Sequence, residues 1–267
     1  MYLQTISFFP IKQFSVSSSL ALIIFLSCSK AVASTSMVEL INEITPSVVG
    51  IGIFTPLEAK NPQLLGTGFV TGNGSYIVTN YHVVARELRL DIVQNYVAMA
   101  GEGQRMKVLK LELLAIDPVH DLAILSMSEK LPALKLAERN LKPAGTDVFF
   151  TGFPIGAVLG LYPATHRGMI AAVAPDINPA RNANQLTIDM LKRLNKPFMI
   201  YQLDATAYPG NSGSPVFEVQ SGEVIAIINK VFVQAGKEAA LTNPSGISYA
   251  IPVAQLKALA QKNDIEL

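Results

Sequence analysis

Most of the chain beyond residue 36 consists of short apolar runs interrupted by glycine, proline, asparagine and aspartate. Such runs are short for helices and are bounded by turn-forming residues, so they predict β-strands. Many short strands with few helical segments predict an all-β fold, either a barrel or a sandwich. The runs that carry this prediction are Val48–Phe54, Gly68–Val70, Tyr76–Val78, Leu122–Leu125, Val148–Phe150 and Val224–Ile228.

Three segments instead have the apolar spacing of helices. This spacing predicts helices over Met37–Ile44 and Val253–Lys262, and a third near residues 186–194 that has cations toward its C-terminal end. The chain shows no internal repeat and no linker rich in glycine, serine or proline. We therefore expect residues 34–267 to form one domain.

Composition excludes several classes of function. Half of the 267 residues are hydrophobic, which rules out intrinsic disorder. Lysine and arginine total 21 against 20 acidic residues, and this net charge of +1 lacks the basic footprint of a nucleic-acid-binding protein. One cysteine and three histidines leave few ligands for a metal site, so we expect no metal or other cofactor.

The first 33 residues have the pattern of a secretory signal peptide. They contain no acidic residue, and the apolar run Leu20–Leu26 is followed by small residues that end in Ala31-Val-Ala33. Seven apolar residues are too few to span a bilayer, which takes about 20. We therefore expect export to the periplasm or the medium, with cleavage after Ala33. Cys28 offers a rival cleavage before a lipid-modified cysteine, but Phe25–Ser27 fits a lipoprotein pattern poorly.

The string Gly210-Asn-Ser-Gly-Ser-Pro215 is the most informative one in the chain. A tight turn there would project the hydroxyl of Ser212, while the amides of Gly210 and Ser212 converge on one point. Such an amide pair binds the oxyanion that forms when a carbonyl is attacked. An ordinary hairpin turn uses the same residue types, so by itself the string leaves both interpretations open.

A serine nucleophile needs a base, and the chain holds three histidines. His82 follows a strand-like run at a helix-start signal, Thr79-Asn-Tyr-His82, and is the favoured base. His120 and His166 lie in polar, turn-like contexts and are expected at the surface.

The base in turn needs an acceptor that fixes its tautomer. Asp121 directly precedes the apolar run Leu122–Leu125, and a buried acid is uncommon unless it is paired. Asp117 precedes a proline and is expected to start a turn. The order His82, Asp121, Ser212 is that of the chymotrypsin triad.

Six motifs cover most of residues 37–252 in one order, and with them the chain resembles the trypsin-like protease domain of the HtrA/DegP family. The motifs are Gly66-Thr-Gly-Phe69, Thr79-Asn-Tyr-His-Val-Val84, His120-Asp-Leu-Ala-Ile-Leu125, Thr151-Gly-Phe-Pro-Ile-Gly156, Gly210-Asn-Ser-Gly213 and Gly246-Ile-Ser-Tyr-Ala-Ile-Pro252.

The resemblance implies two six-stranded β-barrels of the chymotrypsin type, joined near residues 140–146, with the active site between them. It implies His82 as general base, Asp121 as its orienting partner and Ser212 as nucleophile, with the amides of Gly210 and Ser212 as the oxyanion hole. The expected reaction is hydrolysis of peptide bonds in unfolded proteins through an acyl-enzyme intermediate.

The chain departs from the family in several places. HtrA-type proteins carry a PDZ domain after the Ala-Ile-Pro stretch, but 15 residues follow Pro252, so none is expected. Ser214-Pro215 resembles the secreted glutamyl endopeptidases instead. The stretch 175–197 is long for the family and is either a regulatory or partner surface or a plain insertion. A homotrimer is left open, because Met37–Ile44 lacks the aromatic residues of family trimers, although Phe54 follows shortly.

The resemblance assigns the substrate-binding pocket to Thr206, to the stretch Asn229, Lys230 and Val231, and to Ile247. Thr206 carries no charge, so an arginine or lysine side chain would lack a counter-ion there. Val231 and Ile247 would narrow the pocket, which favours cleavage after small aliphatic residues. Residues 229–231 would also pair with an extended substrate as an added strand.

Two alternatives stay open. A glutamate-specific pocket needs strong donors or a cation; Thr206 and Lys230 could supply them, but no histidine follows His166 and Ile228 occupies the matching place. The second alternative is a latent or non-proteolytic, chaperone-like binding module on the same fold. An intact triad favours the active enzyme.

Overall fold

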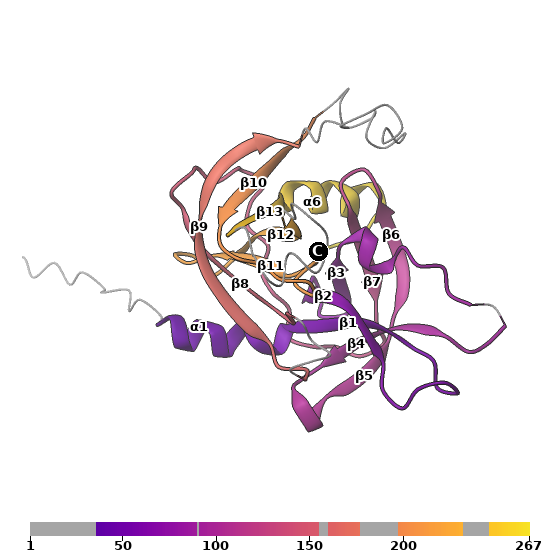
Figure 1. The fold of residues 1–267 in the computed structure, drawn as a ribbon. Helices are drawn as coiled ribbons and strands as arrows, with labels where there is room; N and C mark the ends of the chain where they lie inside the picture. Colours follow the sequence, from indigo (N-terminus) through magenta and orange to yellow (C-terminus); the bar gives the residue numbers. More distant parts are fainter. Residues whose placement is uncertain (1–35, 90, 155–159, 177–196, 232–245) are drawn as a thin grey trace, which may run out of the picture. The chain divides into compact units, whose positions relative to one another are not determined.

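The computed structural model describes residues 36–89, 91–154, 160–176, 197–231 and 246–267. Residues 35–267 form one compact unit, distinct from residues 1–34. This unit is built mainly of two antiparallel β-sheets, with helices at its edges (Figure 1). The helix expected near residues 186–194 lies outside the described residues.

The first sheet has seven strands where six were expected. In space they follow the order β5-β4-β1-β2-β3-β7-β6. Their bounds are β1 Val48–Phe54, β2 Gln63–Thr71, β3 Tyr76–Thr79, β4 Asn95–Ala100, β5 Lys107–Lys110, β6 Glu112–Asp117 and β7 Leu122–Ser126.

The extra strand arises from a bend at one residue. Leu111 alone separates β5 from β6, yet these two strands lie at opposite edges of the sheet. The Leu111 side chain is buried, and its amide donates to the carbonyl of Tyr96 at 2.9 Å. One long strand therefore turns inward at Leu111 and joins the two edges, so the sheet curls as a six-stranded barrel would.

The second sheet is a closed six-stranded barrel, as expected, in the order β10-β13-β12-β11-β8-β9. The segment from 127 to 146 leads into it, and isolated bridges pair Leu134 of this segment with Thr71 and Leu136 with Val224. The strand bounds are β8 Asp147–Gly152, β9 Ala164–Pro175, β10 Met199–Asp204, β11 Pro215–Glu218, β12 Val224–Val231 and β13 Ile247–Pro252.

Three apolar clusters hold the unit together. One fills the first sheet and includes Ile51 and Ile77, and another fills the closed barrel and includes Phe150 and Leu203. The third joins the two sheets and contains Phe69, Phe149 and Leu256 among others. Because full burial of one such side chain stabilises a fold by about 1.5–3 kcal/mol, the third cluster fixes the sheets against each other.

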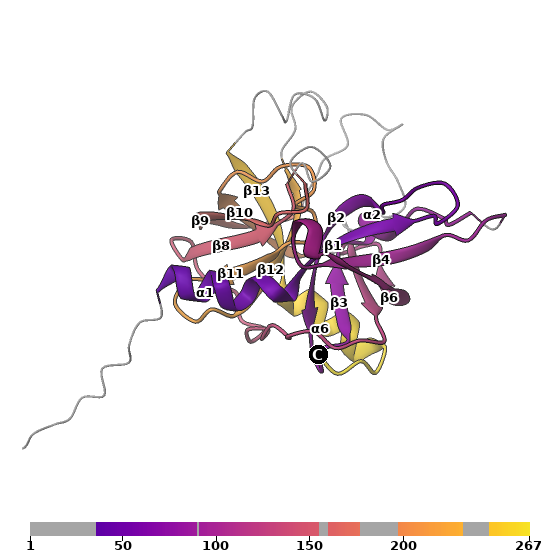
Figure 2. The same ribbon diagram turned by 90° about the horizontal axis from the view of Figure 1, so that it is seen from below.

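The two helices predicted within the described residues are confirmed at their predicted bounds. In α1 (Met37–Ile44) the Ser36 hydroxyl accepts from the Glu39 amide and the Glu39 carboxylate accepts from the Ser36 amide, which is a capping box. It is followed by the 3₁₀-helix η1 (Thr45–Ser47). In α6 (Val253–Lys262) the buried apolar side chains belong to the cluster between the sheets. Figure 2 shows this helix in yellow, close to the C-terminus of the chain.

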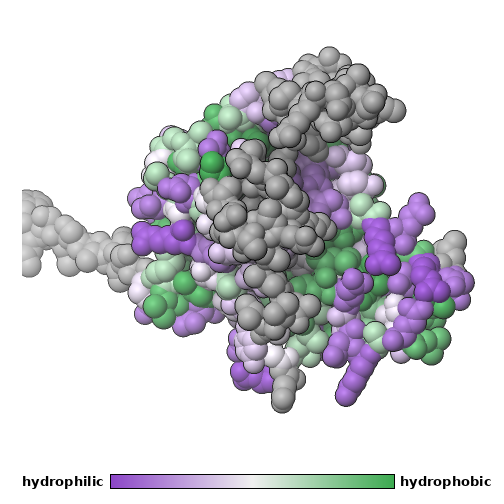
Figure 3. All heavy atoms as spheres, viewed as in Figure 1, coloured by the Kyte–Doolittle hydropathy of each residue, from purple (hydrophilic) through white to green (hydrophobic). Residues whose placement is uncertain are grey.

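The surface is mixed in character. In the view of Figure 3, hydrophilic and hydrophobic residues lie side by side over the first sheet. Among the residues that the structure describes, no helix has both the length and the apolar character needed to cross a membrane.

Candidate active site

One half of the candidate site is a hydrogen-bonded histidine–aspartate pair. His82 lies in α2 (Tyr81–Val84), a single helical turn directly after β3. Its Nδ1 lies 2.7 Å from Asp121 Oδ2, and its backbone amide donates to Asp121 Oδ1 at 2.8 Å. Because an ionised carboxylate accepts, the pair favours a proton on Nδ1 and leaves Nε2 as an acceptor.

The surrounding backbone fixes this carboxylate in place. Asp121 lies between β6 and β7 with φ at 54°, a left-handed conformation that aspartate tolerates better than most residues. The buried Asn80 side chain donates from Nδ2 to the Asp121 carbonyl at 3.1 Å. The Asp121 side chain is 12% exposed and that of His82 is 48% exposed, so the acid is covered while the base faces solvent.

The serine-bearing loop lies between β10 and β11. Gly210 and Gly213 have φ values of 103° and 89°, which residues with a side chain rarely adopt. The Thr67 hydroxyl donates to the Gly210 carbonyl at 2.7 Å, and the Thr67 amide donates to the Ser212 carbonyl at 2.8 Å. Strand β2 of the first sheet thus holds the loop from the other side.

Two amides of this loop are available to a ligand. Among the hydrogen bonds of the described residues, none uses the N–H of Gly210 or of Ser212. The Gly213 amide is used, because it donates to the Ile228 carbonyl at 2.9 Å. The amides of Gly210 and Ser212, which the sequence predicted as an oxyanion hole, are thus among the amides of this loop that make no hydrogen bond to the described residues.

The histidine and the loop approach each other across Gly66. A Cβ atom on Gly66 would lie 2.8 Å from Val83 Cγ2 and 3.0 Å from the Ser212 carbonyl oxygen. Val83 follows His82 directly, so a glycine at position 66 allows the helix with the base and the loop with Ser212 to lie this close. The Gly66-Thr-Gly-Phe69 motif therefore has a spatial reason.

Ser212 does not contact His82 through a hydrogen bond. In the described part of the chain, the Ser212 hydroxyl donates to the Asn229 carbonyl at 3.2 Å, and His82 Nε2 has no hydrogen-bond partner. The structure therefore brings the three predicted residues into one region, with two of them paired and the hydroxyl of the third turned toward β12.

A second feature of the loop is buried polar atoms without partners. Both amide atoms of Asn211 and the hydroxyl of Ser214 are buried and make no hydrogen bond to any residue that the structure describes. A Cβ on Gly152 would lie 2.0 Å from Ser214 Oγ and 2.8 Å from Asn211 Oδ1. Position 152 must therefore be a glycine if the Ser214 hydroxyl is to occupy this place.

The residues predicted to line the specificity pocket lie along β12, β13 and the serine loop. Thr206 and Ile247 are half-buried, and Asn229 is buried. Lys230 pairs with Tyr249 and Val231 with Ser248 in the barrel ladder. The side chains of Lys230 and Val231 are outside what the structure describes, so their part in a pocket stays a prediction.

The expectation that the other two histidines are surface residues is wrong for His166. His166 lies in β9, its ring stacks on Phe150 at 4.9 Å, and its Nε2 is buried without a partner. Burial lowers the pKa of His166 below its usual value. His120 is partly buried in the turn that Asp117 starts as predicted, and its Nδ1 lies 2.6 Å from Asp117 Oδ2.

Sequence reasoning missed the residues that support the site. Asn80 was interpreted as part of a helix start, yet its side chain makes no capping bond and holds Asp121 instead. Thr67 holds the serine loop through its hydroxyl and amide. The signal for both was their place in motifs beside His82 and Phe69, but a motif does not say which atoms meet.

Comparison with known proteins shows which family and which relatives the chain resembles. A sequence profile described as a trypsin-like peptidase domain matches residues 66–227. A probable periplasmic serine endoprotease, DegP-like, of Pseudomonas fluorescens is 31% identical over 195 residues, which cover 73% of this chain and 34% of that protein. Its counterpart in Halomonas elongata is 30% identical over 198 residues, with 73% and 34% covered. The chain thus spans about a third of the length of these relatives.

Solved structures support the fold. The HtrA-type protease AlgW with a decapeptide matches with a TM-score of 0.63 and 22% identity, over 86% of this chain and 67% of that one. The active form of the Rv3671c protease of M. tuberculosis matches with a TM-score of 0.62 and 21% identity, over 85% of both chains. The chain belongs to the family of trypsin-like peptidase domains, and its matched curated relatives are named probable periplasmic serine endoproteases, DegP-like.

Proposed function

We propose that the chain is an exported serine endopeptidase that uses His82, Asp121 and Ser212 as a catalytic triad. The observation that carries the proposal is the carboxylate–imidazole pair, 2.7 Å between Nδ1 and Oδ2, beside a serine loop in which the amides of Gly210 and Ser212 make no hydrogen bond to the described residues. The family of the chain and the names of its relatives support the same reaction class.

The reaction follows from these positions. Ser212 Oγ bonds to the carbonyl carbon of a substrate peptide while its proton passes to His82 Nε2. Asp121 accepts from Nδ1–H and stabilises the imidazolium that forms. The amides of Gly210 and Ser212 bind the oxyanion. The C–N bond then breaks, the proton of His82 goes to the leaving amine, and water hydrolyses the acyl-enzyme with His82 again as base.

Catalysis requires the Ser212 hydroxyl to turn away from Asn229 and toward His82. The Asn229 carbonyl that it leaves is then available to accept an N–H of the substrate backbone. Residues 229–231 are the last three residues of β12, so an extended peptide can pair with this end of the strand through main-chain hydrogen bonds. This mode of binding needs an unfolded substrate, since a folded chain has its own amides paired.

For the residue before the scissile bond, we propose a small aliphatic side chain. Thr206 gives the pocket no buried charge, and Val231 and Ile247 would narrow it. A glutamate-specific pocket through Thr206 and Lys230 is the alternative. Mass spectrometry of cleaved casein decides between them, because cleavage after glutamate would exclude the aliphatic pocket.

The decisive experiment compares the protein from residue 34 onward with its Ser212→Ala variant. Wild type is expected to cleave unfolded casein and to react with a fluorophosphonate label, while the variant loses about 10⁵-fold or more in kcat and all labelling. Ser126→Ala, on β7 away from the serine loop, is the matched control and is expected to keep both. Labelling that persists in Ser212→Ala would exclude this nucleophile.

A latent or non-proteolytic binding module is the second candidate. The bond from Ser212 to Asn229 and the unpaired atoms of Asn211 and Ser214 favour it. Such a module would bind unfolded casein without cleaving it and would resist the label. A latent enzyme would begin to label once a peptide occupies β12, whereas a pure binding module would not.

We also propose that residues 1–33 are a signal peptide removed after Ala33. The relatives are named periplasmic endoproteases, which supports export. The test is the mass of the protein recovered from a periplasmic fraction. The expected mass is that of residues 34–267, and the Cys28→Ser variant should give the same mass. A protein that begins with a lipid-bearing Cys28 would overturn the assignment.

A further inference from the structure

A small polar pocket lies at the first sheet, next to the segment that follows the helix α2 in the chain. It has a volume of about 160 Å³ and lies between the β1–β2 connection and the segment after α2. We call it the Arg86 pocket. The lining residues that matter here are Thr55, Glu58, Gln63, Arg86, Arg89 and Gln94.

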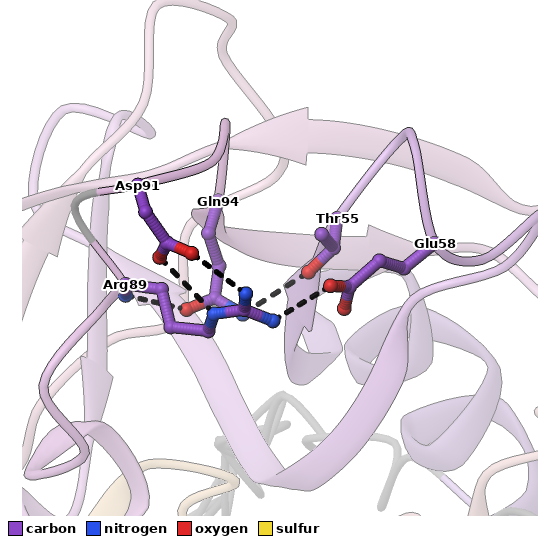
Figure 4. A network of polar contacts seen from close by, with 5 residues as sticks. All are labelled: Thr55, Glu58, Arg89, Asp91 and Gln94. Carbon is purple, nitrogen blue, oxygen red and sulfur yellow. Dashed lines mark hydrogen bonds and ion pairs between the residues drawn. The ribbon is translucent and has the colours of Figure 1, made fainter.

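Hydrogen bonds between its own side chains hold one wall of the Arg86 pocket (Figure 4). The Arg89 guanidinium donates to Asp91 at 2.8 and 3.2 Å and to Glu58 at 2.6 Å. Gln94 accepts from the Arg89 amide at 2.9 Å and donates to the Thr55 hydroxyl at 3.0 Å. The bonds to Asp91 and Glu58 raise the pKa of Arg89, and these two carboxylates offset its charge.

Arg86 is the cation of this pocket that its neighbours leave unneutralised. Within the described parts of the chain no carboxylate lies within ion-pair distance of Arg86, whose Nη1 makes one long contact, 3.5 Å, with Gln63 Oε1. Its backbone is fixed, because the single proton of the buried Tyr96 hydroxyl is shared between the carbonyls of Val84, at 2.8 Å, and Arg86. The side chain is thus anchored at its base and exposed at its tip.

Two sequence distances relate the pocket to the proposed catalytic centre. His82 must deliver its proton to the leaving amine, so that part of the substrate faces His82 and the first sheet, while the acyl part lies along β12. Arg86 follows His82 by four residues. Gln63 precedes Gly66, which touches the Ser212 backbone, by three residues of β2, or about 10 Å at 3.3 Å per residue.

We propose that the Arg86 pocket binds a substrate carboxylate two or three residues after the scissile bond, with Arg86 as the specificity-determining residue. The carboxylate belongs either to an aspartate or glutamate side chain or to the C-terminus of a substrate that ends there. This proposal rests on the proposed peptidase function and on the assignment of His82 as the proton donor.

The experiment measures kcat/KM on one peptide frame, chosen from a casein cleavage site, with glutamate, glutamine or lysine at the second or third position after the scissile bond. Glutamate is expected to exceed glutamine by roughly two- to fivefold, the effect of a solvent-exposed ion pair, and to lose this advantage at 1 M salt. A matched pair that ends there in a free acid or an amide separates the two sources of the carboxylate.

Arg86→Gln is expected to bring the ratio of kcat/KM for the glutamate peptide to that for the glutamine peptide to about one. Arg86→Glu is expected to make the lysine peptide the best substrate of the three. Arg105→Gln, at an exposed arginine outside the pocket, is expected to keep the wild-type ratio. Thermal unfolding shows that each variant is folded. A ratio near one in wild type, or one unchanged in Arg86→Gln, overturns the Arg86 pocket alone. A wild-type protein that cleaves no peptide overturns the peptidase proposal together with it.

Discussion

The two halves of the candidate site differ in how completely their polar groups are paired. On the histidine side, the Asp121 carboxylate accepts from both the side chain and the backbone of His82, and Asn80 donates to its carbonyl. On the serine side, Asn211 and Ser214 bury three polar side-chain atoms without a partner. One such atom, Oδ1 of Asn80, occurs on the histidine side.

This difference in hydrogen bonding indicates that the conformation of the His82–Asp121 pair is fixed, whereas the conformation of the serine loop can change. A buried polar atom without a partner costs about 1–3 kcal/mol, so the serine loop has other arrangements of similar or lower energy open to it. Around Asp121 both carboxylate oxygens are paired and Asn80 Oδ1 is the one buried side-chain atom without a partner among the described residues, so this side has less free energy to gain by rearranging. We infer that any change between a resting and an active state takes place in the loop from Gly210 to Ser214, while His82 and Asp121 stay in place.

The histidine side gives the largest predicted effect. Asp121→Asn should leave the fold intact and lower kcat by about 10⁴-fold, because an amide no longer holds the catalytic tautomer. Asp117→Asn disrupts the neighbouring pair with His120 and should lower kcat less than tenfold. The measurement is kcat on casein-derived peptides. Equal losses in the two variants would mean that the fixed pair has been assigned to the wrong residues.

Gly210→Ala tests the serine side. With φ at 103°, an alanine is strained and displaces an amide of the oxyanion hole, and loss of one such donor costs about 10²–10³ in kcat. Gly145→Ala is the matched control, because its φ is 89° and no atom lies within 4 Å of the new Cβ. It should be strained to the same extent and fully active. If both variants keep their activity, the amide of Gly210 has no catalytic part.

Two hydroxyl deletions sharpen the comparison through stability. Thr79 donates to the Thr67 carbonyl at 2.7 Å, so Thr79→Ala should destabilise by about 1–2 kcal/mol, or roughly 2–8 °C in Tm. The Ser214 hydroxyl is buried without a partner, so Ser214→Ala should leave Tm unchanged or raise it. Calorimetry gives both values. A Ser214→Ala variant as unstable as Thr79→Ala would show that the hydroxyl is bonded in solution.

The smallest effect concerns pH. Burial lowers the pKa of His166, whose ring lies near Tyr208 in the serine-side segment. The unfolded chain therefore binds a proton at a higher pH than the folded one, so stability falls as pH drops below about 6.5, by at most about 1.4 kcal/mol per pH unit. His166→Phe keeps the stack on Phe150 and should flatten Tm between pH 7.5 and 5.5. A parallel decline in both proteins would contradict this role.

Local pattern predicted β1, β2, β3, β7, β8 and β12 and the helices α1 and α6, because turn residues bound those apolar runs. The other described strands, β4, β5, β6, β9, β10, β11 and β13, were not among the predicted runs. The bend at Leu111 was not predicted either, since Lys107–Asp117 has no glycine or proline to mark it. His166 was misplaced because the polar residues around it hide its position opposite Phe150 in the barrel. Motifs identified the candidate triad, but the pairing of Asn80 with Asp121 and the unpaired atoms of Asn211 depend on contacts that are distant in sequence.

The helix α6 has a consequence for how the molecule is made. It contacts β6 and β7 of the first sheet and β12 and β13 of the closed barrel, and it follows every strand in the chain. The ribosome therefore synthesises the described strands of both sheets before it synthesises the helix that contacts both of them. The candidate site, with His82 in one half and Ser212 in the other, can therefore be held together by α6 only after all of the described strands have been synthesised.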